Sequence, residues 1–209
     1  MNSIRTIFVD FGNVIAFFDH ERTTRRLQPH THLQYEQLYK AVYPAKLFNE
    51  FEAGRLATAD YVRRAFAEAA LTCDEAFFRL VFADIFEPNP AVCELIPRLA
   101  ASHRLVLASN TNELHAERFL ETYRSTFGHF QKLVLSHEVG ARKPEADFYA
   151  HCQQFAGCEP GRCLFIDDRA DNIAAAAKHG WQTVQYTEFD SLLRELARLR
   201  VYNNGTILT

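Results

Sequence analysis

The chain has 209 residues, of which 48% are hydrophobic and 18 are Phe, and its net charge is -3. Such a chain can bury a sizeable core, either as one large domain or as a domain with an insert. The charge balance argues against nucleic acid as a partner. No apolar run reaches the roughly 18 residues of a membrane span, and the start MNSIRTIFVDF is unlike a signal peptide, so we expect no membrane contact.

The cysteines are odd in number and show no CxxC spacing; they are Cys73, Cys93, Cys152, Cys158 and Cys163. We interpret them as reduced side chains, packed as small apolar residues rather than acting as catalytic thiols. The sequence therefore predicts a cytoplasmic protein.

Short apolar runs rich in β-formers predict five strands. Each run is too short for a helix and is bounded by polar residues or Gly. The runs are Thr6–Val9, Leu105–Ala108, Leu133–Leu135, Cys163–Ile166 and Thr183–Tyr186. Their lack of alternation is typical of a parallel sheet covered on both faces, and helical patterns lie between the last four. We therefore predict an α/β fold with a doubly wound, five-stranded parallel core sheet of the Rossmann-like kind.

The long stretch between the first two strands has a different pattern. It is rich in aromatic residues at helical spacing, and no strand signal interrupts it. We predict an all-helical cap over residues 19–86, inserted into an α/β core of residues 1–18 and 87–209. Ligands of open α/β sheets bind beyond the carboxyl ends of the strands, so such a cap would cover the site.

Polar side chains follow four of the predicted strands. They are Asp10, Ser109 with Asn110, Lys143 in the segment Arg142-Lys143-Pro144, and Asp167 with Asp168. Each set alone has a structural explanation as a turn residue, a helix cap or a solvated loop residue. Parallel strands bring all four sets to one edge of the sheet, however, and this convergence indicates a functional site.

The chemistry of these side chains suits phosphoryl transfer. A carboxylate such as Asp10 can attack phosphorus and form an aspartyl-phosphate. Because the substrate is also anionic, a hard cation with oxygen ligands is needed, and Mg²⁺ accepts few carboxylates plus water. Asp10 and Asp168 supply two ligands, and the backbone carbonyl near Gly12 is a candidate third. The groups suited to offset the phosphate's charge or to donate hydrogen bonds to it are Lys143, Ser109 and Asn110.

These residues lie in segments that resemble the haloacid dehalogenase (HAD) superfamily of aspartate-nucleophile hydrolases. The segments are FVDFGNV, LVLASNTN, GARKPEADFY and FIDDRADNIAAAAKHG, and the resemblance extends over residues 5–190. The helical insert, with its stretch FEAGRLATADY, resembles the superfamily's first type of cap. Among subgroups, the chain is most similar to bacterial sugar-phosphate phosphatases of the α-glucose-1-phosphate type and to the phosphatase domain of bifunctional epoxide hydrolases.

The resemblance implies a role for each matching residue. Asp10 would be the nucleophile, and Asp10 and Asp168 would be metal ligands, with Asp167 or Asn172 supporting the metal through water. The implied phosphate contacts are Ser109, Asn110 and Lys143. The implied substrate is a small phosphorylated metabolite and the implied cofactor is Mg²⁺.

Gly12 departs from the superfamily's usual pattern. Most of its phosphatases have Asp there, which acts as general acid and base and binds the metal through its carbonyl. Gly keeps the carbonyl and loses the proton donor. Asp19, His20 or a metal-ordered water are the candidate replacements, although Asp19 is expected rather to cap the first cap helix. Phe17, Phe18 and His20 are candidates to face the site from the side of the cap, although Phe17 and Phe18 are expected rather to pack at the hinge between the two domains.

Two other functions are compatible with parts of the pattern. Halide leaves without a proton, so the absence of an acid at position 12 also suits a metal-independent 2-haloacid dehalogenase. The adjacent acids Asp167 and Asp168 argue against it, because paired carboxylates without a cation repel each other. A non-catalytic binding protein could keep the same fold, but the joint presence of Asp10, Ser109, Lys143 and Asp168 argues for an enzyme. The sequence does not predict an oligomeric state.

Overall fold

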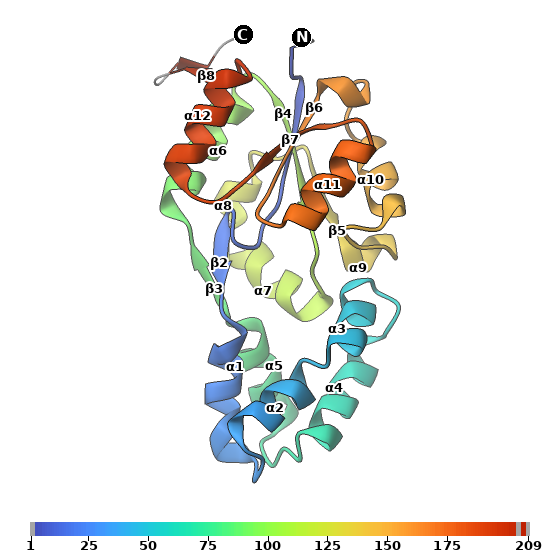
Figure 1. Cartoon of the computed structure of the whole chain (residues 1–209). Coiled ribbons are helices and arrows are strands. Elements are labelled where there is room, and N and C mark those ends of the chain that lie inside the picture. Colours follow the sequence, from blue (N-terminus) through green and yellow to red (C-terminus); the bar gives the residue numbers. More distant parts are fainter. Residues whose placement is uncertain (1–2, 204–205, 208–209) are drawn as a thin grey trace.

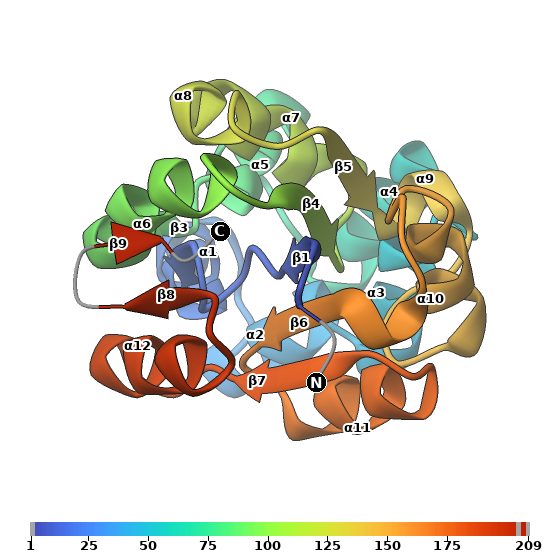
Figure 2. The same cartoon turned by 90° about the horizontal axis from the view of Figure 1, so that it is seen from above.

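The computed structural model describes residues 3–203 and 206–207. Its centre is a five-stranded parallel sheet in the order β5-β4-β1-β6-β7 (Figures 1 and 2). These strands are β1 (Thr6–Val9), β4 (Arg104–Ser109), β5 (Lys132–Leu135), β6 (Cys163–Asp167) and β7 (Gln182–Gln185). Each lies within one residue of its predicted range, so the doubly wound α/β fold is confirmed.

Helices cover both faces of the sheet, which explains the apolar runs without alternation. On the central strand, Ile7 and Val9 face one hydrophobic cluster while Phe8 faces the other, where its ring stacks on Trp181 with centroids 4.1 Å apart. The first cluster includes residues of α6 (Pro90–Ala100), α7 (Glu113–Thr122), α8 (Arg124–Phe127) and α12 (Phe189–Arg198). The second includes residues of α10 (Ala146–Gln153) and α11 (Ala170–Lys178), with Val139 of α9 (Ser136–Val139) packed against it.

Residues 19–85, within the segment between β1 and β4, contain five α-helices with an aromatic core of their own, below the sheet in Figure 1. They are α1 (His20–Leu27), α2 (Tyr35–Val42), α3 (Ala45–Glu52), α4 (Thr58–Glu68) and α5 (Glu75–Ala83). Two short antiparallel strands, β2 (Ala16–Phe18) and β3 (Phe86–Pro88), connect them to the sheet. The sequence did not reveal this two-stranded link. The division into a core of residues 1–18 and 87–209 and a cap of residues 19–86 remains our proposal.

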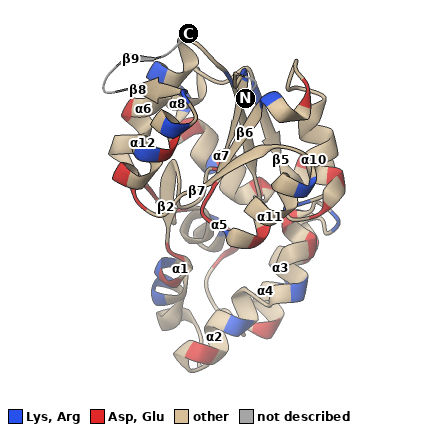
Figure 3. Cartoon of the chain, turned by 45° about the horizontal axis from the view of Figure 1, so that its top comes forward, with Lys and Arg blue, Asp and Glu red and all other residues tan. Residues whose placement is uncertain are grey.

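The remaining elements are short. They are the 3₁₀ turns Gln28–His30 and Pro160–Arg162 and the antiparallel pair β8 (Tyr202–Asn203) and β9 (Thr206–Ile207). Basic and acidic residues are interspersed over the helices of both parts (Figure 3). Within the described ranges, no helix combines the length and the apolarity needed to cross a bilayer.

Candidate active site

The carboxyl ends of the strands point toward the helical cap (Figure 1), and a hollow of about 280 Å³ lies there. Core residues that line it include Asp10, Asn110, Lys143, Asp168 and Asn172. The cap and its link contribute Phe18, His20, Phe48, Asn49 and Glu52. The polar sets that follow the strands therefore meet at one edge of the sheet, as the parallel topology requires.

Lys143 is the centre of the charged network. Its Nζ lies 2.7 Å from Asp10 Oδ1 and 2.7 Å from Asp167 Oδ2, and only 1% of its side chain is exposed. Burial alone lowers the pKa of Lys143, but the two carboxylates outweigh burial and hold this pKa above its usual range. Lys143 is therefore a fixed, buried cation and not a solvated loop residue.

The Asp10 carboxylate is oriented through one of its oxygens. Oδ1 accepts a hydrogen bond of 2.7 Å from the backbone N–H of Phe11 and faces Lys143. Burial raises the pKa of Asp10, Lys143 opposes the rise, and the charges of Asp167 and Asp168 add to it. The site thus carries more negative charge than Lys143 alone neutralises.

Asp167 and Asp168 differ in what their oxygens do. Asp167 is fully buried, and each of its oxygens has two donors: the Arg169 N–H and Asn172 Nδ2 for Oδ1, and Lys143 Nζ and Asn172 Nδ2 for Oδ2. A direct bond from Asp167 to a metal would displace one of these donors. Asp168 is half-buried and accepts one hydrogen bond, from Asn13 Nδ2 at 3.0 Å. The geometry therefore favours Asp168 as a ligand and Asp167 as the residue that anchors Lys143.

The donor set fits a hard divalent cation. Oxygen atoms of Asp10, Asp167 and Asp168 lie within 4.8 Å of one another. In addition, Asn172 Oδ1 is buried and has no hydrogen-bond partner among the described residues, so an acceptor is left over beside the carboxylates. Gly12 lines the same hollow. An all-oxygen set of this kind is what Mg²⁺ prefers.

Ser109 and Asn110 lie at the end of β4, where Ser109 is buried and Asn110 is partly buried. Asn110 Oδ1 accepts from the backbone N–H of Lys143 at 2.8 Å, and its Nδ2 donates to the Lys143 carbonyl at 2.8 Å. This pair of bonds fixes the loop that carries Lys143. Ser109 is buried, and its hydroxyl has only a long contact of 3.4 Å, to the Asn110 carbonyl. A phosphate contact by either side chain remains a proposal, and Asn110 has one Nδ2 hydrogen left for it.

The ring of Phe18 leaves little space for a side chain at position 12. A Cβ placed on Gly12 would lie 3.0 Å from Cε1 and 3.2 Å from Cδ1 of the Phe18 ring. The ring is 39% exposed and lines the hollow together with His20. Phe17 is also exposed, but it does not belong to the lining of this hollow.

The two side chains considered as proton donors have different surroundings. Asp19 caps α1, accepting from the Glu21 N–H at 2.8 Å, and pairs with Arg25 at 2.6 Å, so it acts as the expected helix cap. His20 stacks on Tyr43 with centroids 4.4 Å apart. Burial lowers the pKa of His20 to about 4, so the imidazole is neutral at pH 7 and is a poor acid.

Sequence reasoning missed the cap residues that meet the core. Glu52, the last residue of α3, pairs with Arg142 through Oε2 and Nη2 at 2.8 Å. The Glu52 carbonyl also accepts from the Ser136 hydroxyl at 2.5 Å. Glu52 and Arg142 lie in segments that resemble the superfamily, FEAGRL and GARKP. No spacing rule links positions so far apart in the sequence.

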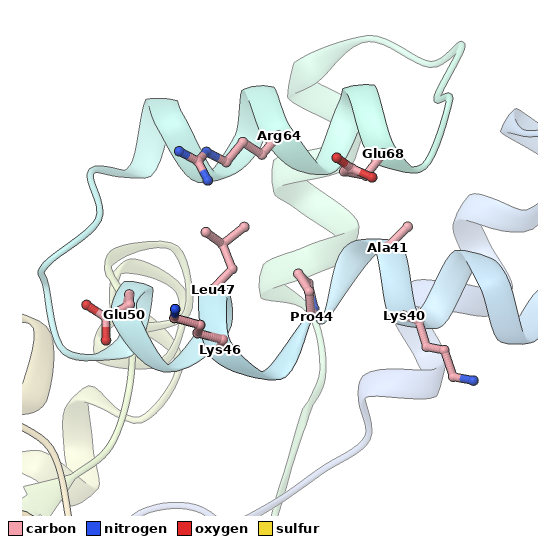
Figure 4. Close-up of a pocket in the computed structure, with 8 residues that line it drawn as sticks. All are labelled: Lys40, Ala41, Pro44, Lys46, Leu47, Glu50, Arg64 and Glu68. Atoms are coloured by element: carbon pink, nitrogen blue, oxygen red, sulfur yellow. The ribbon is translucent and has the colours of Figure 1, made fainter.

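A second hollow lies wholly within the cap, between α2, α3 and α4 (Figure 4), with a volume of about 430 Å³. Ala41, Pro44 and Leu47 form an apolar part of its lining. The charged residues around it are Lys40, Lys46, Glu50, Arg64 and Glu68. This hollow is larger than the one at the sheet edge, but it contains no cluster of three carboxylates, so the sheet edge is the candidate active site.

Comparison with known proteins identifies the class. A model of the haloacid dehalogenase-like hydrolase family matches residues 4–180, and the chain therefore belongs to this family of hydrolases. D-ribitol-5-phosphate phosphatase of Bacteroides thetaiotaomicron is 25% identical over 191 residues, which cover 87% of this chain and 91% of that protein. Flavin mononucleotide hydrolase 1 of Arabidopsis thaliana is 37% identical over 63 residues, which cover 30% of this chain and 26% of that protein.

Solved structures share the fold. A predicted HAD-like family hydrolase from Porphyromonas gingivalis matches with a TM-score of 0.79 and 25% identity, over 95% of this chain and 98% of that one. A HAD family enzyme from Bacteroides thetaiotaomicron, solved in complex with magnesium and inorganic phosphate, matches with a TM-score of 0.74 and 20% identity, over 88% and 95% of the two chains.

Proposed function

We propose that the protein is a Mg²⁺-dependent phosphatase that hydrolyses small phosphate monoesters through an aspartyl-phosphate on Asp10. The observation that carries the proposal is the pairing of Asp10 with the buried Lys143 at 2.7 Å, in a hollow that Asp168 also lines. A nucleophilic carboxylate, a fixed cation and a further ligand then face the same small volume. The HAD family enzyme solved with magnesium and inorganic phosphate supports the proposal that a metal and a phosphoryl group bind at this site.

Each residue has a defined task in this proposal. The Phe11 N–H and Lys143 hold Oδ1 of Asp10, which orients the carboxylate toward phosphorus. Attack forms a bond between phosphorus and an Asp10 oxygen and breaks the bond to the leaving oxygen, which takes up a proton. Water then attacks the phosphorus, releasing inorganic phosphate and regenerating the carboxylate. Lys143 offsets negative charge on the phosphoryl group throughout.

Asp10 and Asp168 would hold the metal, with the Gly12 carbonyl as a third protein ligand. Asp167 and Asn172 would support it from behind, since Asp167 already has its donors. When bound, Mg²⁺ would offset the combined charge of the carboxylates and the phosphate. This assignment agrees with the unpartnered Oδ1 of Asn172.

The D-ribitol-5-phosphate phosphatase supports phosphorylated sugars and sugar alcohols as the substrate class, and hence a small phosphorylated metabolite as the partner. We also propose a cytoplasmic location, which the five free cysteines support. The competing function is that of a metal-independent 2-haloacid dehalogenase, which Gly12 alone favours.

The test is phosphate release from p-nitrophenyl phosphate and from a panel of sugar phosphates, with Mg²⁺ or with a chelator, beside halide release from 2-chloropropionate. We expect phosphate release that needs the metal, and no halide release. Asp10→Asn should lose all turnover, while Asp190→Asn, at an exposed acid of α12 that does not line the hollow, serves as the matched control. Halide release that survives chelation would replace the phosphatase by the dehalogenase. Absence of any turnover would favour a non-catalytic protein.

A further inference from the structure

The outer part of the hollow is built by the cap and its link, away from the strand ends. Its side chains are positioned to meet the part of a substrate that carries no phosphate. They are Phe18, His20, Phe48, Asn49 and Glu52. None of them has a task in the phosphoryl-transfer chemistry described above, so their properties indicate which leaving group the site accepts.

The cations around the hollow are already neutralised. Arg142 pairs with Glu52 at 2.8 Å, and this pair is mostly buried, with 21% and 13% of the side chains exposed. Arg169 binds Asp171 with both Nη2 and Nε, at 2.8 and 3.1 Å. Lys143 lies between Asp10 and Asp167. Within the described part of the chain, each basic residue that lines the hollow thus faces a carboxylate, and a second anionic group on the substrate would find no unpaired cation.

The polar groups that remain are uncharged. Asn49 is exposed, and none of the hydrogen bonds described for this chain uses its side chain. His20 is held by stacking on Tyr43, at 4.4 Å between centroids, and its neutral ring has one donor and one acceptor nitrogen. An amide and a neutral imidazole both donate and accept, as hydroxyl groups do. The rings of Phe18 and Phe48 add apolar surface for the carbon side of a sugar.

The hollow is small. Its 280 Å³ lies just below the roughly 300–1,000 Å³ that ligand sites usually have, so it suits a small leaving group.

We propose that the outer hollow selects an uncharged, polyhydroxylated leaving group, that of a small sugar or sugar alcohol with a single phosphate, and that Asn49 and His20 bind its hydroxyl groups. The inference rests on the proposed phosphatase function and adds to it the specificity-determining residues and a limit on substrate charge. Substrates with a carboxylate or a second phosphate near the scissile bond are disfavoured by the closed Glu52–Arg142 pair.

The first test compares kcat/KM for ribitol 5-phosphate, 2-phosphoglycolate, fructose 1,6-bisphosphate and p-nitrophenyl phosphate. The wild type should prefer ribitol 5-phosphate to both substrates with a second anionic group. Asn49→Ala and His20→Phe should each lower the ratio of ribitol 5-phosphate to p-nitrophenyl phosphate activity about fivefold, as expected for one neutral hydrogen bond. Lys46→Ala should leave this ratio unchanged, because Lys46 is on the same helix as Asn49 but lines the hollow between α2, α3 and α4.

The second test reverses the preference. Glu52→Gln should free Arg142 and raise kcat/KM for 2-phosphoglycolate relative to ribitol 5-phosphate by about tenfold, since a charge-assisted contact becomes available. Two results would overturn the inference and leave the phosphatase function intact, provided that p-nitrophenyl phosphate is hydrolysed. One is a preference of the wild type for an anionic leaving group. The other is a ratio of ribitol 5-phosphate to p-nitrophenyl phosphate activity that Asn49→Ala and His20→Phe leave unaltered. Failure to hydrolyse any phosphate ester would overturn both.

Discussion

The ring of Phe18 lies over Gly12, so close that a Cβ on Gly12 would meet the ring at 3.0 Å. The two residues are brought together by the turn between β1 and the short strand β2, which carries Phe18. The space beside Gly12 is therefore occupied by the Phe18 ring and not by a carboxylate at position 12. The leaving oxygen must then take its proton from water or, where the leaving group is acidic enough, depart as an anion.

We predict a steep dependence of rate on leaving-group acidity, because general acid catalysis is typically worth about 10²–10⁴-fold and Gly12 supplies none. The measurement is kcat/KM across a series of substituted phenyl phosphates. The double variant Gly12→Asp with Phe18→Ala should flatten the dependence, and Phe18→Ala alone is its control. The ring is removed because a Cβ at position 12 would lie 3.0 Å from it and require it to shift. A flat dependence in the wild type would show that another group donates the proton.

Lys143→Ala should destabilise the fold as well as abolish turnover. Removing the cation leaves Asp10 and Asp167 buried without their partner, which typically costs about 3–5 kcal/mol. Urea unfolding without metal should show the loss, and added Mg²⁺ should restore part of it. Lys46→Ala, at an exposed position on α3, is the control. An unchanged unfolding midpoint for Lys143→Ala would mean that the buried ion pairs do not form in solution.

Asn110 should act mainly through Lys143. Its side chain makes two hydrogen bonds of 2.8 Å to the Lys143 backbone, so Asn110→Ala should cost about 1–3 kcal/mol of unfolding free energy and lower kcat. Asn110→Asp keeps the acceptor for the Lys143 N–H but turns a second oxygen toward the Lys143 carbonyl and adds negative charge, so it should not restore either measurement. Full activity and stability of Asn110→Ala would contradict this positioning role.

Asp168→Asn should raise the Mg²⁺ concentration needed for half-maximal activity at least tenfold, because it removes one of two charged ligands. Asp190→Asn should leave the metal titration unaltered, since Asp190 is exposed on α12 and does not line the hollow. Coincident titration curves for Asp168→Asn and the wild type would exclude Asp168 as a ligand.

Local patterns were sufficient to predict the sheet and the residues at its edge. Apolar runs located all five core strands within one residue, and parallel topology then placed Asp10, Asn110, Lys143 and Asp168 around one hollow. The helical nature of the insert followed from its aromatic spacing in the same way. The strands and the helical insert depend on residues that are neighbours in the sequence. The position of the site residues depends only on the rule that parallel strands end at the same edge of the sheet.

The contacts that shape the site depend on tertiary packing and could not be predicted. Asn110 reaches across 33 residues to Lys143, and Glu52 across 90 residues to Arg142. The sequence suggested that the Asn110 side chain faces phosphate, because a turn amide and a ligand-binding amide look alike in sequence. Only the packing of the Lys143 loop against β4 shows that the amide also makes two hydrogen bonds to the Lys143 backbone, while its phosphate contact stays a prediction.

The most direct test of the account is the mass of the peptide that contains Asp10, after acid quenching during turnover of p-nitrophenyl phosphate with Mg²⁺. We expect a phosphoryl adduct on Asp10 that is absent in Asp10→Asn and absent when a chelator replaces the metal. A phosphoryl adduct on another residue, or phosphate release at the wild-type rate by Asp10→Asn, would contradict the proposal that Asp10 is the nucleophile.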